Sequence, residues 1–271
     1  MNFIILISIP DRSGLIHKVS STLLNYNIEK NDEFVDKENS HFFMRTKIKA
    51  DEYTTKEEIK SKLKNILPKE SFIKIVKEEK KSIIILCTKE SHCLGDILIK
   101  HYNKELEIKA VISNHNDLES LVKKFDIPYF YISHNIANQE ELMIEKCKEF
   151  NASFIILAKY MRILSPKFVK EFNERIINIH HSFLPAFVGA NPYKQAYDRG
   201  VKIIGATAHF VNDELDCGPI ICQDTMQVDH TYSWKDMQKA GKNIERIVLA
   251  KAIELAIDDR IFIYKNKTII F

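Results

Sequence analysis

Several features that define other classes of protein are missing from this chain of 271 residues. Its five cysteines include no Cys-x-x-Cys pair, so we expect free thiols in a reducing compartment rather than a disulfide framework. No His/Cys cluster has the spacing of metal ligands, so no metal is predicted. The net charge is only +3 and no segment is strongly basic, which argues against nucleic acid as a partner.

Long hydrophobic runs are also missing. The N-terminal run Phe3–Ile9 is too short to span a membrane. It lacks the basic region and the cleavage site of a signal peptide, and two charged residues follow it at once. We therefore expect a cytoplasmic protein with no membrane partner. The hydrophobic share of 45% is ample for a packed core.

Glycine is unusually scarce, with 7 residues in the chain, where the average protein has roughly 7%. Four of the seven lie close together, at Gly189, Gly200, Gly205 and Gly218. Glycine that persists where it is otherwise rare indicates a backbone geometry that other residues avoid. The neighbouring run Ile176–Tyr193 has no Asp, Glu, Lys or Arg, although 28% of the chain is charged. Both features direct attention to the segment 176–219.

The first 80 residues predict a small β-α-β-β-α-β domain. Apolar periodicity predicts strands over 2–9, 28–36, 41–49 and 72–76, and helices over 13–26 and 55–66, with Ser13 or Asp11 near the first cap. The charged run Lys77–Lys81 reads as a solvated linker. We therefore predict two domains, 1–80 and 81–271.

From residue 82 onward, strand patterns alternate with helix patterns. Strands are expected over 82–87, 108–113, 129–132, 154–157, 176–179, 202–211 and 219–228, with helices over 93–103, 116–124, 138–149, 192–199 and 233–257, another opening at Pro166, and a terminal hairpin after Arg260. This order predicts an α/β fold with a doubly wound, mostly parallel sheet. Such sheets place their sites beyond the carboxyl ends of strands.

Three polar residues in the segment 176–219 suggest acyl-transfer chemistry. Asn178 and His180 flank Ile179 at the end of a strand, so their side chains leave on one face. An amide and an imidazole can donate to a developing oxyanion, and Asp216 can orient the imidazole or a water. The residue types alone also fit a structural role, because turn Asx residues and single buried histidines are common.

The surrounding strings resemble the formyltransferase family that uses 10-formyltetrahydrofolate. The two matching motifs are Asn178–Tyr193, with its Asn-x-His and Ser-x-Leu-Pro spacing, and Gly205–Ile220, with Leu-Asp-x-Gly-Pro. The resemblance implies that Asn178, His180 and Asp216 are the catalytic residues. We also expect the apolar residues Phe183, Leu184, Phe187 and Val188 to raise the pKa of Asp216 by burial.

A third match implies a folate pocket. Ile156–Leu164 resembles the family's folate-pocket strand and loop, which assigns substrate binding to Met161, Arg162, Ile163 and Leu164. Ordinary packing is the alternative for the apolar members. His181 and His209 lie beside the site in the sequence; His209 is assigned to substrate binding or to its support, and His181 equally fits a structural role.

The loop after residue 87 separates the members of this family. A loop that holds a substrate phosphate needs glycines, so that backbone N–H groups can approach it. Cys87–Gly95 instead has one late glycine and an acidic residue, and it resembles the loop of formyltetrahydrofolate deformylases. The resemblance implies that His92, Cys93 and Leu94 close the space of an amine acceptor, although His92 also fits a helix cap.

The N-terminal segment Ile9–Leu15 resembles an ACT domain, a regulatory module that binds small amino acids between paired copies. It implies an effector near Asp11, Gly14 and Leu15, and a homo-oligomer. The expected function is hydrolysis of 10-formyltetrahydrofolate to tetrahydrofolate and formate for one-carbon and purine metabolism, with the folate as substrate and no cofactor. The alternatives are formyl transfer to an amine such as glycinamide ribonucleotide, and an inactive folate-binding regulator.

Overall fold

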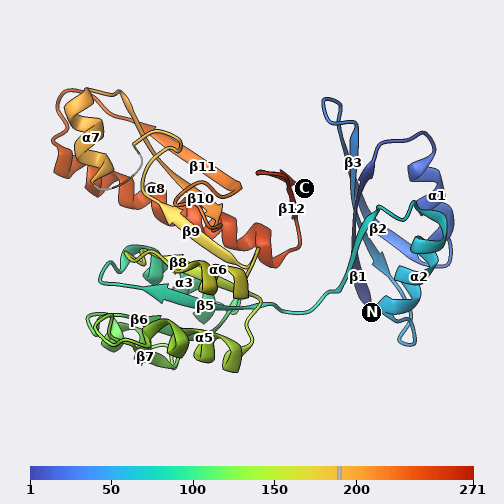
Figure 1. Cartoon of the computed structure of the whole chain (residues 1–271), viewed down its shortest axis with the longest axis horizontal. Helices are drawn as coiled ribbons and strands as arrows, with labels where there is room; N and C mark the ends of the chain where they lie inside the picture. The colour runs from blue at the N-terminus through green and yellow to red at the C-terminus, as the bar shows by residue number, and fades with distance from the viewer. Residues whose placement is uncertain (188, 190) are drawn as a thin grey trace. The chain divides into compact units, whose positions relative to one another are not determined.

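The computed structural model describes residues 1–187, 189 and 191–271 and divides the chain into two compact units. One unit comprises Met1–Glu79 with Phe271, and the other comprises Lys80–Ile270. In Figure 1 the first unit is drawn in blue to cyan and the second in green to red. Within the described part of the chain, no helix combines the length and the apolar character needed to cross a membrane.

The N-terminal unit is a four-stranded antiparallel sheet with two helices. The elements are β1 (Asn2–Pro10), α1 (Leu15–Thr22), β2 (Asn27–Asp36), β3 (His41–Lys49), α2 (Lys56–Ile66) and β4 (Phe72–Lys77), and the strand order is β2-β3-β1-β4. Alternate residues of β1, from Phe3 to Ile9, pack against Leu15 and Val19 of α1 and against Ile59 of α2. The period-2 pattern of the strand therefore places both helices on one face of the sheet.

The first helix is shorter than the predicted range 13–26, and its cap is different. Gly14 is the N-cap residue, in a left-handed conformation with φ of 81°, and no side chain caps the helix. The cap lies next to Ser13, as expected, but neither Ser13 nor Asp11 caps the helix with its side chain. The backbone of Asp11 is hydrogen-bonded to the turn between β2 and β3, because its N–H donates to the carbonyl oxygen of Ser40 at 2.8 Å.

The C-terminal unit contains a seven-stranded sheet in the order β11-β10-β9-β8-β5-β6-β7. Its strands are β5 (Ser82–Cys87), β6 (Glu107–Ser113), β7 (Tyr129–Tyr131), β8 (Phe154–Ala158), β9 (Ile176–His180), β10 (Ile203–Phe210) and β11 (Ile220–Gln227). The strands from β5 to β9 pair in parallel, and β10 pairs antiparallel with both β9 and β11. The predicted α/β class and mostly parallel sheet are confirmed.

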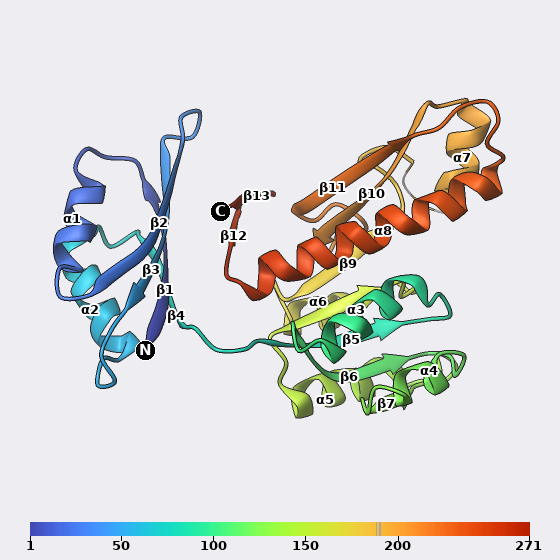
Figure 2. The same cartoon turned by 180° about the vertical axis from the view of Figure 1, so that it is seen from behind.

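Helices cover both faces of this sheet, as Figures 1 and 2 show. Their bounds are α3 (His92–Tyr102), α4 (Glu119–Lys123), α5 (Gln139–Phe150), α6 (Pro166–Glu171), α7 (Pro192–Arg199) and α8 (Trp234–Ile257). In the fully buried strand β5, Ile83 and Ile85 pack in the cluster with α3, α7 and α8, whereas Ile84 and Leu86 pack in the cluster with α5 and α6. This two-sided burial explains the continuous apolar run in the sequence. The hairpin of β12 (Ile261–Tyr264) and β13 (Lys267–Ile270) ends the unit.

The topology brings the carboxyl ends of β5, β8 and β9 together. The chain runs from β5 outward to β6 and β7 and then returns to the other side of β5 as β8. Ala158 at the end of β8 lies beside Cys87 of β5, and Asn178 of β9 lies beside Leu157 of β8. A reversal of strand order at this edge is where open α/β sheets bind their ligands.

Candidate active site

The polar residues of the site come from the pairing of β9 with β10. Asn178 lies opposite His209, and His180 lies opposite Thr207, in an antiparallel register. Asn178 and His180 alternate with the buried Ile179 and therefore share one face of the sheet, as the sequence predicted. His209 joins them from the next strand and is 2% exposed.

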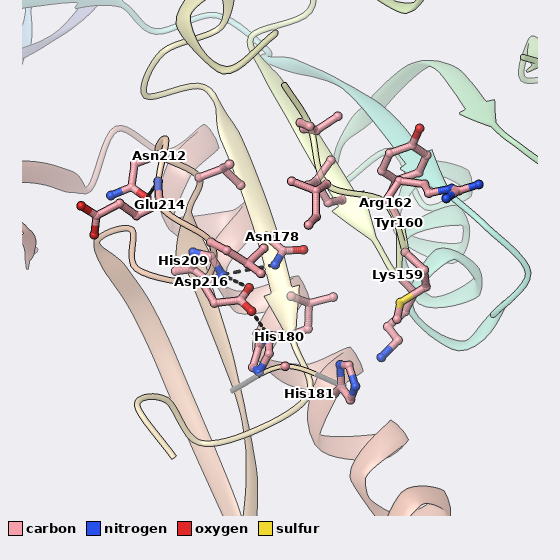
Figure 3. Close-up of a pocket in the computed structure, with 18 of the residues that line it drawn as sticks. Lys159, Tyr160, Arg162, Asn178, His180, His181, His209, Asn212, Glu214 and Asp216 are labelled. Carbon is pink, nitrogen blue, oxygen red and sulfur yellow. Dashed lines mark hydrogen bonds and ion pairs between the residues drawn. The ribbon is translucent and has the colours of Figure 1, made fainter. Parts of the chain in front are cut away.

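Asp216 completes this group from the loop that follows β10. Its Oδ2 atom lies 3.2 Å from Nδ1 of His180, and its Oδ1 atom lies 3.7 Å from Nε2 of His209. Asn178 Nδ2 lies 3.2 Å from the same His209 nitrogen. Figure 3 shows the carboxylate of Asp216 between the two imidazoles, with the amide of Asn178 beside His209. The structure thus brings together all three residues that the resemblance assigned to catalysis.

Both ring nitrogens of His209 have hydrogen-bond partners. Its Nδ1 lies 2.8 Å from the carbonyl oxygen of Phe210, which can only accept, so Nδ1 carries a proton. Nε2 lies between the amide of Asn178 and the carboxylate of Asp216: in the neutral ring it accepts from the amide, and in the protonated ring it donates to the carboxylate. This contact fixes the amide group so that its second N–H remains for a substrate oxygen. His209 is therefore a residue that orients Asn178, in addition to lining the cavity.

The electrostatics of Asp216 differ from our expectation. Burial alone raises the pKa of this carboxyl group, but hydrogen bonds from His180 and His209 and their positive charges outweigh it, and the net pKa lies well below the usual range. The expectation of a raised pKa is wrong, because it considered apolar neighbours and missed the two imidazoles. Phe183, Leu184 and Phe187 do not line the cavity at Asp216, and Val188 lies outside the described residues.

His180 has an orientation suited to donation. Its Nδ1 faces the carboxylate of Asp216, and its Nε2 is buried without a partner among the described residues. A carboxylate on one ring nitrogen stabilises the protonated imidazole and leaves the opposite N–H to bond a developing negative charge. The ring is 5% exposed, and in such a poorly solvated place this hydrogen bond is stronger than in water.

These residues form one side of a cavity of about 330 Å³. The other side is the loop after β8, which contributes all four residues assigned to the folate pocket: Met161, Arg162, Ile163 and Leu164. Met161 and Ile163 are 57% and 75% exposed, so ordinary core packing does not account for them, whereas Leu164 is 8% exposed and belongs to the core. Residues 211–216 form the remaining wall.

Of the three residues assigned to the acceptor side, His92 lines a cavity, whereas Cys93 and Leu94 do not. His92 is the first residue of α3; its Nε2 lies 2.8 Å from Oε2 of Glu245, and it lines a second cavity. Cys93 and Leu94 are at most 1% exposed, lie in the core and line neither of these cavities. The helical period turns them toward the sheet together with Ile97 and Leu98, so our expectation that they bound the acceptor space is not met.

Two buried charged residues near this cavity were not singled out from the sequence. Lys159 Nζ lies 3.1 Å from Oε2 of Glu245, and the Tyr193 hydroxyl donates to Oε1 at 2.7 Å. Burial raises the pKa of Glu245, but the hydrogen bond of His92 and the charge of Lys159 prevail and lower it to about 2. His92, Lys159 and Tyr193 thus surround Glu245 in a buried hub. A glutamate on the apolar face of α8, four residues after Gly241, is the sequence signal that could have revealed it.

The hub also contains a set of atoms that could contact a metal ion. His92, Cys93 and Glu245 each offer one ligand atom within 4.8 Å of the others. The ammonium group of Lys159 already neutralises the carboxylate, so the cluster does not present the negative charge that favours a divalent cation. The prediction that the chain binds no metal remains a prediction.

The residues assigned to an effector lie in the turn between β1 and α1. Gly14 supplies the left-handed backbone before the helix, and the side chain of Leu15 is 4% exposed in the core of the N-terminal unit. Asp11 is exposed. The structure therefore leaves the Asp11 side chain and the backbone of the turn accessible, and it withdraws the Leu15 side chain.

Comparisons with known proteins agree with this site. The family model described as formyl transferase matches residues 81–253. A formyltetrahydrofolate deformylase of Haemophilus influenzae is 51% identical, with 98% of each chain covered. The crystal structure of a formyltetrahydrofolate deformylase from Pseudomonas syringae superposes with a TM-score of 0.94 at 38% identity, covering 100% of this chain and 94% of that one. A glycinamide ribonucleotide transformylase from Symbiobacterium toebii has a TM-score of 0.68 at 26% identity, covering 72% of this chain and 96% of its own. Identity and coverage of this extent show that the chain belongs to the formyltetrahydrofolate deformylase family.

Proposed function

We propose that this chain hydrolyses 10-formyltetrahydrofolate to tetrahydrofolate and formate in the cavity at the carboxyl ends of β8 and β9. The observation that carries the proposal is the convergence of Asn178, His180 and Asp216 on one side of that cavity, opposite the loop 161–164. Membership of the deformylase family supplies the substrate and the reaction. The pterin ring occupies the space between this loop and residues 211–216, with the formyl group at Asn178 and His180.

The oxyanion is stabilised by two donors. As water attacks the formyl carbon, the carbonyl oxygen gains negative charge and accepts hydrogen bonds from the free N–H of Asn178 and from Nε2–H of His180. Removing one donor of this kind costs about 2.7–4 kcal/mol, or roughly 100- to 1000-fold in kcat. The preset partners of both side chains reduce the reorganisation needed at that moment.

Asp216 acts through charge and orientation. Its lowered pKa keeps it ionised, and the ionised carboxylate at Nδ1 holds the His180 ring with Nε2 toward the oxyanion. Both oxygens of this carboxylate face imidazole nitrogens, at 3.2 Å and 3.7 Å, so neither is directed at an attacking water. Asp216 therefore serves best by orienting His180 rather than by removing the proton of the water.

The loop after β5 favours water over a phosphorylated amine as the acceptor. Glu90 in this loop is paired with Lys242 at 2.6 Å, and Glu245, which lines the same cavity, is paired with Lys159 at 3.1 Å. A substrate phosphate placed here would approach two carboxylates whose cationic partners are already engaged. Hydrolysis therefore fits the described residues better than transfer to glycinamide ribonucleotide.

We further propose that the N-terminal unit binds a small amino acid at the turn 11–15 and that the protein acts as a cytoplasmic homo-oligomer without a cofactor. The exposed edge strands β2 and β4 offer unpaired backbone groups for association. Light scattering with and without amino acids, together with a thermal-shift screen of amino acids, tests both proposals. A monomer that responds to no amino acid would contradict them.

The central experiment supplies purified protein with 10-formyltetrahydrofolate in buffer that contains no amine acceptor. We expect equal amounts of tetrahydrofolate and formate from the wild type. Asp216→Asn and Asn178→Ala should lose most of this turnover while their circular dichroism stays unchanged. Absence of both products from the wild type, or full turnover in Asp216→Asn, would refute the proposed function or its site.

A further inference from the structure

A second cavity, of about 270 Å³, adjoins the first. The two cavities share Lys159, Met161, His181 and Gly189 as lining residues, so they meet at the end of the first cavity that also contains His180. A small molecule in the second cavity is thus next to the place where the formyl group reacts.

The charges around the second cavity are paired. Lys242 Nζ lies 2.6 Å from Oε2 of Glu90, and Lys159 Nζ lies 3.1 Å from Oε2 of Glu245. These four side chains leave no unmatched full charge among them to hold an ionic ligand. A polar cavity whose lysine and glutamate side chains are paired with each other, connected to a reaction site, is suited to water.

The side chain of His181 lines both cavities, and its ring nitrogens are available for hydrogen bonds. Its ring lies 5.3 Å from the ring of His180 and 6.0 Å from that of Tyr193, and it makes no hydrogen bond to a described residue. Figure 3 shows it at the lower end of the first cavity, next to His180 and below the ammonium group of Lys159.

The surroundings of His181 keep the ring uncharged. Burial, followed by the positive charge of Lys159 from the loop after β8, lowers the pKa of His181 to about 4. His180 on β9 acts in the same direction, whereas Glu245 on α8 and Asp216 in the loop after β10 oppose the shift. At neutral pH the imidazole therefore has a free lone pair. The lowered pKa also makes the ring a weaker base than free imidazole, so its role depends on its position where the two cavities meet.

We propose that the second cavity supplies the attacking water and that the imidazole of His181 accepts the proton of that water, an inference that rests on the proposed hydrolysis of 10-formyltetrahydrofolate. Asp216 is not available for this role, since its two oxygens face His180 and His209. The ring of His180 is oriented by Asp216 and serves as a hydrogen-bond donor to the oxyanion. His181 remains as a base on the side of the site that adjoins the second cavity.

The step balances with the groups present. The water oxygen forms a bond to the formyl carbon while one O–H proton passes to His181, and the carbonyl electrons move to the oxygen held by Asn178 and His180. The tetrahedral intermediate then expels N10 as the C–N bond breaks. The proton on His181 passes to N10, which yields tetrahydrofolate, and the formic acid loses its remaining proton to solvent.

The test compares His181→Gln and His181→Ala with His230→Ala, which alters an exposed histidine outside the site. General-base catalysis contributes roughly 100- to 10,000-fold. We therefore expect kcat for hydrolysis to fall at least about 100-fold in both His181 variants with KM little changed. Added imidazole should restore part of the lost kcat in His181→Ala, and the His230 variant should match the wild type.

A second nucleophile separates this role from a structural one. Hydroxylamine is a strong uncharged nucleophile that attacks the formyl carbon without prior loss of a proton, giving formohydroxamate and tetrahydrofolate. The His181 variants should retain this reaction while they lose hydrolysis. Unchanged hydrolysis, or equal loss of both reactions without imidazole rescue, would overturn the role of His181. Absence of hydrolysis in the wild type would instead overturn the proposed function.

Discussion

The buried charged hub at Glu245 provides the sharpest prediction about stability. Glu245 is 1% exposed, and its carboxylate contacts His92 at 2.8 Å, Lys159 at 3.1 Å and Tyr193 at 2.7 Å. Glu245→Gln keeps the size and most hydrogen bonds, but it leaves the ammonium group of Lys159, which is 8% exposed, without its counter-charge. We therefore expect a loss that is mainly electrostatic.

The size of the loss follows from the burial. Removing one partner of a buried ion pair costs about 3–5 kcal/mol. In a unit of this size, 1 kcal/mol shifts the melting temperature by roughly 2–4 °C. We expect Glu245→Gln to melt roughly 6–20 °C below the wild type. The double variant with Lys159→Met removes both charges and should recover part of the loss, with a coupling of about 0.5–3 kcal/mol.

The chain offers a specific probe for this measurement. Trp234 is the single tryptophan and begins α8, the helix that bears Glu245, so its fluorescence reports on the unit of interest. The pKa of Glu245 is lowered from 4.5 to about 2, so its contribution is complete above pH 4.5 and is lost as the pH falls through about 2. The difference in free energy of unfolding between the wild type and Glu245→Gln should therefore disappear as the pH falls from 4.5 to about 2. A loss below about 1 kcal/mol at pH 7, or strict additivity in the double variant, would refute the reasoning.

Three further predictions concern the active-site loops. Because the pKa of Asp216 is lowered, its ionised carboxylate stabilises the folded state at pH values above the ordinary pKa of 3.8. The difference in free energy of unfolding between the wild type and Asp216→Asn, measured in urea, should therefore shrink as the pH falls below 3.8. A difference that does not change with pH would contradict this. Gly218→Ala places a Cβ 1.8 Å from the carbonyl oxygen of Phe210, so a loss of about 1–3 kcal/mol is expected, whereas equal melting temperatures would exclude the clash. Thr207→Val removes the hydroxyl that accepts from the N–H of Leu184 at 3.0 Å, which should lower the free energy of unfolding by about 1–3 kcal/mol. It should also lower kcat, because the segment after His180 loses this anchor. Unaltered stability would disprove this link.

Local patterns in the sequence were sufficient for most of the fold. The alternation of apolar residues along β1 and the fully apolar run of β5 correctly predicted a one-sided and a two-sided sheet. Element bounds were wrong where a few residues decide them, as at α1, whose start depends on the left-handed backbone of Gly14, and at α4, which is only Glu119–Lys123. Such ends depend on individual hydrogen bonds that periodicity does not encode.

Strand alternation and motif resemblance likewise identified the central part of the site. Placing Asn178 and His180 on one face needed only the period of a strand, and the motifs pointed to Asp216 and to the loop 161–164. The helix face of Cys93 and Leu94 was misjudged, because resemblance assigns a segment to a site without saying which of its side chains turn toward the core.

Local patterns along the chain therefore specify the class of fold, the order of elements and the residue types at the site. The electrostatics of the site depend on the folded arrangement. The sign of the pKa shift of Asp216 depends on two imidazoles delivered by the antiparallel pairing of β9 and β10. The pairing of Lys159 with Glu245 joins a strand end to a helix far along the chain. Coulomb energies and desolvation depend on distances in space, and spacing along the chain does not specify those distances.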